Sequence, residues 1–332
     1  MRIHAIADGA PLGDVVPLGL DGVPAVVARA AAAGKAWAGL APHQRADALA
    51  AAADDLDLLA DELAPLHAAE SGKVLGQAVH ELHGAARLVA RNAELGRYAA
   101  GELAPTGALP GGDADLTLVE RVPLGVVVAV VPFNFPVELA MEKAAAALAA
   151  GNSVIVKLPP QNPLATRRAV EALAARLPFG VVQAVYGTTD VAQALCCEPG
   201  VAAVSLTGSV GAGVAVAQAT AHLLRPLHLE LGGNGAVIVL PDADLDLVVA
   251  ETLRGRLLMN GQACAATKRV IAHTDIAAEL TARLEAALAG VVPGDPLAEG
   301  TRLGPLIDAA AAARVQAQVG RAVAAGARQL LG

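Results

Sequence analysis

The chain has 332 residues, which is enough for about two domains and a sizeable core. Hydrophobic residues make up 55% of the chain and charged residues 17%, which excludes a disordered or low-complexity protein. The net charge of −8 gives little support for nucleic acid as a partner. No basic region followed by an apolar run begins the chain, and the most apolar stretch, 124–131, is too short to span a membrane. Three cysteines cannot form a disulfide framework, so we expect a soluble cytoplasmic protein.

The first part of the chain has the pattern of helices. Residues 24–100 are rich in alanine and carry apolar residues three and four positions apart. Residues 104–115 form a cluster of turn-forming residues, and a short strand is expected within 116–125. The pattern therefore predicts a helical region followed by a small hairpin.

From residue 124 apolar runs alternate with helical patterns. The expected strands are 124–131, 153–157, 180–185, 201–206 and 227–231, and the expected helices are 137–150, 163–176, 189–196 and 211–222. Short links between them predict a parallel sheet with helices on both faces. Ligands bind at the carboxyl ends of such strands, so we expect function near 132–136, Lys157, Gly187, 207–213 and 230–233.

A second unit of similar texture follows residue 235. Its expected strands are 236–240 and 268–273, and its expected helices are 242–257, 276–289 and 308–328. The sequence shows no internal repeat, and no flexible linker separates this unit from the first one. The whole chain therefore has the pattern of an α/β protein.

Three local motifs have ordinary structural explanations. Gly208, Gly211 and Gly213 follow a strand and precede a helix, where they suit either a bound phosphate or a tight turn. His80 and His83 lack the spacing of a zinc helix, so we expect both on the surface. The adjacent cysteines at 196–197 are expected to pack as small apolar side chains.

Three other residues carry side chains suited to chemistry on a carbonyl group. Cys264 lies in a glycine-containing loop, Glu230 ends a strand before two glycines, and Asn134 lies between two phenylalanines. A thiol in such a loop can be a nucleophile, the carboxylate can act as a base on water, and a rigid amide can donate to an oxyanion. Alone, each could be a core thiol, a capping carboxylate or a turn asparagine. Together at strand ends of one sheet system, they favour a catalytic group.

Five segments resemble those of the NAD(P)-dependent aldehyde dehydrogenase superfamily. They are PFNFP at 132–136, GNSVIVK at 151–157, SLTGSVGAG at 205–213, LELGGN at 229–234 and NGQACAATKR at 260–269. ESGK at 70–73 and LGPLID at 303–308 agree, so the resemblance covers nearly the whole chain. The combination of ELGG with GQxC is highly specific. It implies a doubly wound, Rossmann-like cofactor domain at 1–100 and 124–231, a hairpin arm for oligomerisation at 101–123, and an incomplete α/β catalytic domain at 232–332.

The resemblance also implies catalytic roles. Cys264 would attack the aldehyde carbon, and the Asn134 side-chain amide and the backbone N–H of Cys264 would hold the oxyanion. Glu230 would activate water to release the carboxylic acid, and its presence argues against transfer of the acyl group to coenzyme A. Lys143 would help to relay protons, with a solvated helix lysine as the alternative.

The implied cofactor is NAD or NADP. Lys157 would bind the adenosine ribose, Gly208 and Ser209 would meet the pyrophosphate, and Gly187 and Gly213 would allow close approach. The implied cofactor-binding set is Val131, Pro132, Phe133, Lys157, Gly187, Gly208, Ser209, Gly213, Leu231 and Gly232. Many NAD-preferring members carry a glutamate where this chain has Pro160. A carboxylate there would repel a 2′-phosphate, so we expect NADP to be tolerated.

The family usually continues for well over a hundred residues beyond this point, including a Glu-x-Phe-Gly-Pro segment and a strand that pairs with a neighbouring subunit. The resemblance therefore indicates either a fragment or a naturally short product. The expected activity is oxidation of a small aldehyde to a carboxylic acid, in a homo-oligomer if the chain is full-length, with no metal, membrane or nucleic acid involved. The alternative is a catalytically impaired, truncated protein that binds cofactor or a partner. Esterase activity from the same cysteine is a weaker rival.

Overall fold

The structure is a computed structural model of the chain, and it describes residues 1–331 except 100, 105, 109 and 113–115. A five-stranded parallel sheet lies at its centre, in the order β7-β6-β5-β8-β9. The strands are β5 (Val126–Val130), β6 (Ser153–Lys157), β7 (Val182–Val185), β8 (Val201–Thr207) and β9 (Leu227–Glu230). The chain builds outward from β5 through β6 and β7, then returns to its other side for β8 and β9. The strand order thus reverses between β5 and β8, where ligands of such sheets bind.

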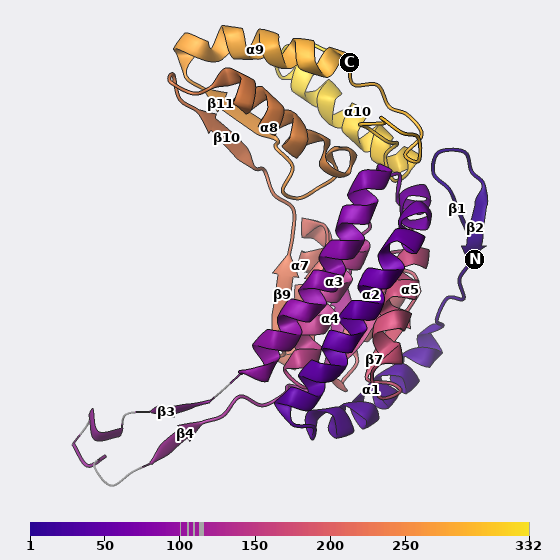
Figure 1. Ribbon diagram of the computed structural model, residues 1–332, viewed down its shortest axis with the longest axis vertical. Coiled ribbons are helices and arrows are strands. Elements are labelled where there is room, and N and C mark those ends of the chain that lie inside the picture. The colour runs from indigo at the N-terminus through magenta and orange to yellow at the C-terminus, as the bar shows by residue number, and fades with distance from the viewer. Residues whose placement is uncertain (100, 105, 109, 113–115, 332) are drawn as a thin grey trace.

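Helices cover both faces of this sheet (Figure 1). One face carries α1 (Val23–Ala38), α6 (Thr189–Cys197) and α7 (Val210–Thr220). The other carries α4 (Pro136–Ala149) and α5 (Leu164–Ala175), with α2 (Pro42–Ser71) and α3 (Leu75–Arg97) packed outside them. The expected doubly covered sheet is confirmed.

Alternation along β5 explains why both faces are apolar. Val127 and Ala129 enter the core under α4, whereas Val126 and Val128 enter the core under α1, because successive side chains of a strand point to opposite faces. The small side chains of the alanine-rich helices let α2, α3 and α4 approach one another closely. The continuous run of β-branched residues is therefore the signature of a strand buried on both sides.

A smaller unit lies at one end of the molecule (Figure 1). Its two parallel strands are β10 (Ala236–Val239) and β11 (Arg269–Ala272), and its helices are α8 (Leu245–Leu257), α9 (Thr274–Ala289) and α10 (Ala309–Ala324). The segment after β9 leads directly into this unit. The loop of residues 258–268 connects α8 to β11 in this smaller unit. Part of it lies beside the carboxyl ends of the strands of the large sheet.

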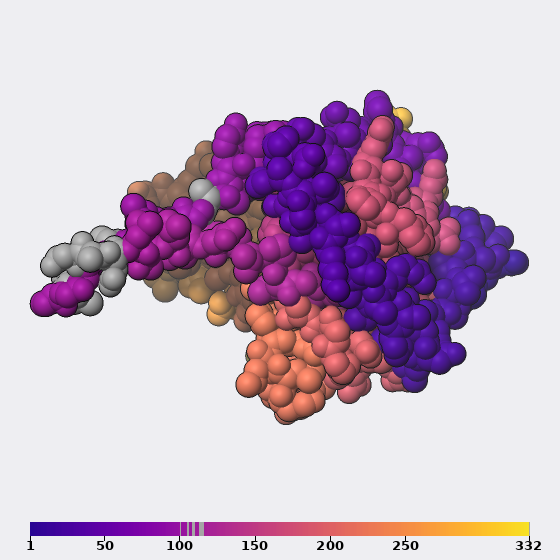
Figure 2. Space-filling model, turned by 90° about the horizontal axis from the view of Figure 1, so that it is seen from below, coloured from indigo at the N-terminus to yellow at the C-terminus, as the bar shows by residue number. Residues whose placement is uncertain are grey.

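Two hairpins complete the described fold. The pair β1 (Arg2–His4) and β2 (Pro11–Asp14) was not expected from the sequence. The pair β3 (Glu102–Ala104) and β4 (Thr117–Val119) stands clear of the body, as Figures 1 and 2 show. Of the expected turn cluster at 104–115, residues 105, 109 and 113–115 lie outside the described residues.

Several expected boundaries were wrong, and glycines with positive φ account for three of them. The expected helical region 24–100 is three helices, and Gly72 (φ 73°) ends α2. The strand expected from residue 124 starts after Gly125 (φ 129°), and the helix expected to reach 328 ends before Gly326 (φ 99°). Glycine adopts this backbone region without the penalty of a Cβ atom, which interrupts regular elements.

Candidate active site

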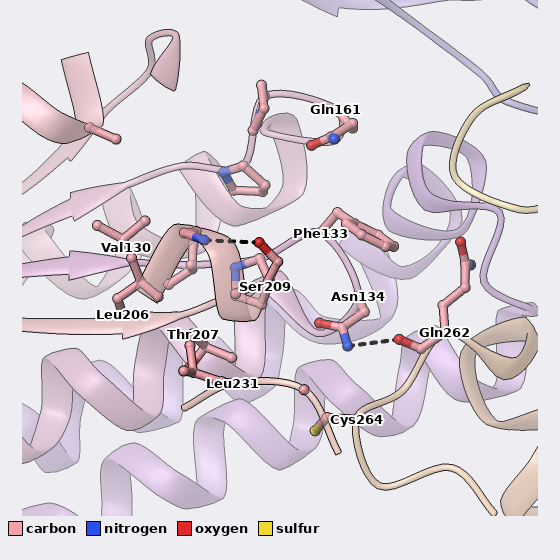
Figure 3. Close-up of a pocket in the computed structure, with 18 of the residues that line it drawn as sticks. Val130, Phe133, Asn134, Gln161, Leu206, Thr207, Ser209, Leu231, Gln262 and Cys264 are labelled. Carbon is pink, nitrogen blue, oxygen red and sulfur yellow. Dashed lines mark hydrogen bonds between the residues drawn. The ribbon is translucent and has the colours of Figure 1, made fainter. Parts of the chain in front are cut away.

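A cavity of about 680 Å³ lies where β5, β6 and β8 end, beside the loop of residues 261–264 (Figure 3). This is the carboxyl edge of the sheet, at the reversal of strand order. Ten of the residues predicted for the site line this cavity: Val131, Pro132, Phe133, Asn134, Lys157, Gly208, Ser209, Leu231, Gly232 and Cys264. Segments separated by more than a hundred residues therefore share one hollow.

The Asn134 amide is directed toward the loop that carries Cys264. Asn134 is buried between β5 and α4, and its Oδ1 accepts a hydrogen bond from the backbone N–H of Phe135 at 3.0 Å. Its Nδ2 donates to the carbonyl of Gln262 at 3.0 Å, two residues before Cys264. Figure 3 shows this bond with Cys264 close by, and the Cys264 side chain is exposed. A thiol open to the cavity rim and an amide donor therefore come from adjoining loops.

The loop before Cys264 is held by a buried asparagine. Met259 and Asn260 both have left-handed backbone angles, with φ of 49° and 56°. Such a conformation costs roughly 1–3 kcal/mol per residue unless the surroundings impose it. Here Asn260 donates to the carbonyl oxygens of Gly72 at 2.7 Å and Pro305 at 2.9 Å, and accepts from the N–H of Gly304 at 2.8 Å. These bonds tie the loop to the end of α2 and so fix the position of Cys264.

The opposite wall of the cavity suits an anion. Lys157, the last residue of β6, is buried, and burial lowers the pKa of its ammonium group to about 8. The start of helix α7 lines the same cavity, and its N-cap Ser209 accepts a hydrogen bond from Ala212 N–H at 3.2 Å. A helix N-terminus and a buried ammonium group both favour negative charge.

Two predicted glycines lie behind the wall of the cavity. A Cβ at Gly213 would stand 2.6 Å from a methyl carbon of Leu231, and one at Gly187 would stand 2.8 Å from Val191. Neither residue is among those that line the cavity. Gly213 therefore allows the start of α7 to pack closely against Leu231, and Gly187 leaves room for Val191 at the start of α6.

Glu230 and Lys143 also lie outside the cavity lining. Glu230 ends β9 opposite Thr207, its carbonyl accepts from Gly208 N–H at 3.0 Å, and its side chain is exposed. Lys143 is buried on α4, where burial lowers its pKa while the carboxylates of Glu142 and Glu230 act in the opposite direction. The interpretation of Lys143 as a solvated helix lysine was therefore wrong. Its ammonium group interacts electrostatically with Glu230.

The remaining motifs behave as ordinary structure. His80 is exposed and His83 contacts Asp57 with its Nδ1 at 2.7 Å, and the described residues contain no cluster of His, Cys, Asp or Glu fit for a metal ion. Burial raises the pKa of the Cys196 thiol to about 12, and the adjacent Cys197 acts in the same direction. All three cysteines are free thiols, of which Cys264 is the exposed one. Across the described residues, no helix combines the length and apolarity needed to cross a bilayer.

Sequence reasoning missed several residues of the site. Gln262 contributes the carbonyl that orients Asn134, Asn260 holds the loop, and Lys268 lines the cavity and donates to the carbonyl of Cys264 at 2.6 Å. All three lie within the NGQACAATKR segment, so the segment was a signal for them. Their particular roles depend on backbone carbonyl groups, which no residue pattern identifies.

The chain matches the model of the aldehyde dehydrogenase family over residues 2–332. It is 37% identical to a vanillin dehydrogenase from an Amycolatopsis strain, over 98% of this chain and 66% of that protein. It is 35% identical to an NADP-dependent glyceraldehyde-3-phosphate dehydrogenase from Streptococcus equinus, over 100% of this chain and 70% of that protein. A solved structure of the enzyme of that name from Bacillus halodurans, complexed with NADP, superposes with a TM-score of 0.95 at 33% identity, covering 100% of this chain and 70% of the other.

These matches extend over almost the entire chain and include its fold. The chain spans about two thirds of the length of the curated relatives it matches, with 66%, 65% and 62% of three of them covered. The cavity at the sheet edge, the loop of Cys264 and the segment of Asn134 all lie inside the matched region. The chain therefore belongs to the aldehyde dehydrogenase family.

Proposed function

We propose that this chain carries the site of an oxidoreductase that converts an aldehyde to a carboxylic acid with NAD or NADP. The hydrogen bond from Asn134 to Gln262 is the main support, because it brings an amide donor to the loop of an exposed thiol at the rim of an anion-binding cavity. In this proposal residues 1–100 and 124–231 hold the cofactor, 101–123 form an arm, and 232–332 belong to the catalytic domain.

The proposed chemistry starts at Cys264. Its thiolate attacks the aldehyde carbon, a C–S bond forms, and the carbonyl π electrons move to oxygen. The Asn134 amide N–H and the backbone N–H of Cys264 hold this oxyanion, because charge develops there as the bond forms. A nicotinamide cofactor, when bound, would accept the hydride from the former aldehyde carbon, and re-formation of the C=O bond would leave a thioester on Cys264.

Release of the acid requires water, and Glu230 is the proposed base. Its carboxylate takes a proton from water, the new hydroxyl attacks the thioester, and Cys264 leaves as the thiolate. The electrostatic interaction of the buried Lys143 ammonium group with Glu230 supports the proposed role of Lys143 in passing the proton onward. The exposed position of Glu230 at the end of β9 gives it access to solvent.

The residues of the anion-binding wall fit the proposed cofactor. Lys157 would bind the adenosine ribose, and the start of α7 with Gly208 and Ser209 would meet the pyrophosphate, because a helix N-terminus favours phosphate. The apolar segment Val131–Phe133 and the segment Leu231–Gly232 also line the cavity. The relatives carry names as different as vanillin dehydrogenase and betaine aldehyde dehydrogenase, so the proposed substrate class is aldehydes in general.

An aldehyde panel tests the proposal directly. The chain is incubated with NAD or NADP and each of a set of aromatic, aliphatic and phosphorylated aldehydes, and the absorbance of the reduced nicotinamide is followed. Aldehyde-dependent reduction with stoichiometric acid supports the proposal. Cofactor binding without turnover of any aldehyde contradicts it and favours the binding-module alternative, and turnover of p-nitrophenyl acetate without cofactor favours an esterase.

Replacing Glu230 by Gln is expected to slow steady-state turnover about 10²-fold, because the amide cannot take a proton from water. Acylation does not use this base, so the first turnover should still release a burst of reduced cofactor at close to the wild-type rate. Stopped-flow absorbance separates the two phases. Asp275→Asn, an exposed carboxylate at the start of α9, is the matched control for the loss of a negative charge. Equal loss in the burst and in the steady state would contradict the assigned role.

NADP is expected to be used with a kcat/KM within about a hundredfold of that for NAD. Pro160 lines the cavity close to Lys157, so no carboxylate at that position repels a 2′-phosphate. Introducing Pro160→Glu should shift the preference toward NAD by at least tenfold, because the new carboxylate binds the ribose hydroxyls. Steady-state kinetics with both cofactors measure the ratio. A several-hundred-fold preference of the unaltered chain for NAD would contradict this expectation.

We also propose a homo-oligomer and a cytoplasmic location. The hairpin β3–β4 stands clear of the body and exposes Leu103 and Leu118, and such apolar side chains favour burial against another copy. Free thiols are consistent with a reducing compartment. Light scattering of the purified chain determines the mass of the assembly.

A further inference from the structure

We propose that Glu81 and Lys73 are positioning residues for the oxyanion amide of Asn134. Neither lines the cavity, and neither carries a role in the chemistry proposed above. Both act on the segment that follows Asn134. Glu81 binds its backbone, and Lys73 contacts the aromatic ring of Phe135. The inference rests on the proposed function for its kinetic consequence, whereas its structural part can be tested without turnover.

Helix α4 starts two residues after Asn134, and Glu81 supplies its cap from another helix. The N-cap position of α4 is Phe135, whose side chain makes no capping hydrogen bond. Instead, Oε1 of Glu81 on α3 accepts from the backbone N–H groups of Val137 at 2.9 Å and Glu138 at 3.2 Å. The first free amides of a helix need such an acceptor, and a carboxylate suits them best. Glu81 therefore fixes where α4 begins.

The other carboxylate oxygen of Glu81 is held by two buried side chains. Oε2 pairs with the ammonium group of Lys73 and contacts Nε2 of His67 at 2.7 Å, and all three side chains have no solvent exposure. Burial alone would raise the pKa of Glu81, but the charges and hydrogen bonds of Lys73 and His67 lower it to about 2. The cap on α4 is therefore an ionised carboxylate, and Lys73 and His67 hold its second oxygen in place.

Lys73 also contacts the residue next to Asn134. Its Nζ lies 3.9 Å from the centre of the Phe135 ring, a geometry in which the ammonium charge attracts the face of an aromatic ring. The backbone N–H of Phe135 in turn donates to Oδ1 of Asn134. This bond defines which end of the amide faces Gln262, so the donor nitrogen is turned toward the loop of Cys264. Lys73 thus contacts the first residue of the segment from Phe135 to Glu138, and Glu81 binds the backbone of its last two residues.

The burial of this ion pair supports a positioning role. A buried pair of charges often gives no more stability than apolar side chains of similar volume, because removing the charges from water is costly. Its directional bonds do what apolar packing cannot, since they set the position of a particular backbone segment. Positioning within a fraction of an ångström matters for oxyanion donors.

The test replaces the pair with apolar side chains and then restores only the acceptor. The first variant is Lys73→Met/Glu81→Leu, and the second is Lys73→Met/Glu81→Gln, whose amide oxygen can again accept from Val137 and Glu138. The rate of the first-turnover burst is measured for both, alone and combined with Asn134→Ala. Cofactor affinity is measured in parallel by fluorescence titration.

The first variant is expected to lose at least tenfold in burst rate, with the dissociation constant of the cofactor within about threefold. The second variant should recover most of that loss. In the Asn134→Ala background, the first variant should lose less than twofold, because the amide that it positions is already absent. A tenfold loss in both backgrounds, or full activity of the first variant, would overturn the inference.

Hydrogen–deuterium exchange tests the same contacts without turnover. The amides of Val137 and Glu138 should exchange at least tenfold faster in Lys73→Met/Glu81→Leu and close to the original rate in the Gln variant. Glu70→Gln is the matched control, because Glu70 is a buried carboxylate that caps α5 through Leu164 and Ala165. It should leave the start of α4 unchanged. Should the unaltered chain oxidise no aldehyde, the proposed function fails while this measurement still decides the inference; unchanged exchange at 137–138 would refute it.

Discussion

Replacing Cys264 by alanine is expected to abolish aldehyde-dependent cofactor reduction, with a loss of at least about 10⁴-fold in kcat. Without the sulfur no covalent intermediate forms, and the hydride would have to leave a free aldehyde or its hydrate. The rest of the cavity is unchanged by this substitution. The dissociation constant of the cofactor should therefore stay within about threefold, as fluorescence titration can measure.

The chain offers a matched control for this experiment. Cys197 is a partly exposed thiol at the end of α6, and its Sγ contacts only the carbonyl of Ala219, at 3.8 Å, among the hydrogen bonds of the described residues. Cys197→Ala removes one sulfur atom from a residue that does not line the cavity, and it should keep nearly full turnover. Labelling with iodoacetamide followed by mass spectrometry should modify Cys264 first, since Cys196 is buried with a raised pKa. Retained dehydrogenase turnover in Cys264→Ala would end the assignment.

The central sheet could be predicted because its strands are unusually uniform. Residues 126–130 and 153–157 are buried on both faces, so apolar side chains occupy every position of the first strand and the three central positions of the second. The N-terminal hairpin β1–β2 could not be predicted in this way. Its burial alternates weakly, and only Ile3 enters the core. Strands of three and four residues are too short to show the alternation of apolar and polar residues that identifies a strand.

The functional residues were found through motifs, whereas their supports were not. Asn134, Lys157 and Cys264 lie in segments with a distinctive composition, and the structure places all three on one cavity. Gly187 and Gly213 belong to such segments as well, but they contribute by close packing behind the wall. A sequence pattern marks a glycine as necessary without saying whether a ligand or a side chain approaches it.

The buried charges of α2 and α3 show most clearly what a sequence does not reveal. His80, Glu81 and His83 are neighbours in sequence, but on a helix they point in different directions, so His80 is exposed while Glu81 is fully buried. Whether a charged residue on a helix faces water depends on what packs against that helix. The start of α4, more than fifty residues later in the chain, packs against the side of α3 that carries Glu81.

Replacing Asn134 by alanine is expected to lower kcat by about 10²- to 10³-fold, which is the usual cost of losing one oxyanion donor. The amide contributes most when the carbonyl oxygen gains charge, so kcat and kcat/KM should fall together, with little change in KM. Pre-steady-state kinetics should place the loss in the burst, because the oxyanion first forms when Cys264 attacks. The Glu230→Gln variant should instead slow the later phase.

Asn134→Asp tests the donor alone, because the side chain keeps its shape and loses its N–H groups. At neutral pH it would place a carboxylate next to the carbonyl of Gln262, where Nδ2 now donates at 3.0 Å, and next to the developing oxyanion. Both contacts would become repulsive, so we expect a larger loss than with alanine. Circular dichroism and a thermal melt confirm that the variant is folded. An Asp variant as active as the Ala variant would show that Asn134 does not face the reacting oxygen, and the backbone N–H of Cys264 would then be left as the donor.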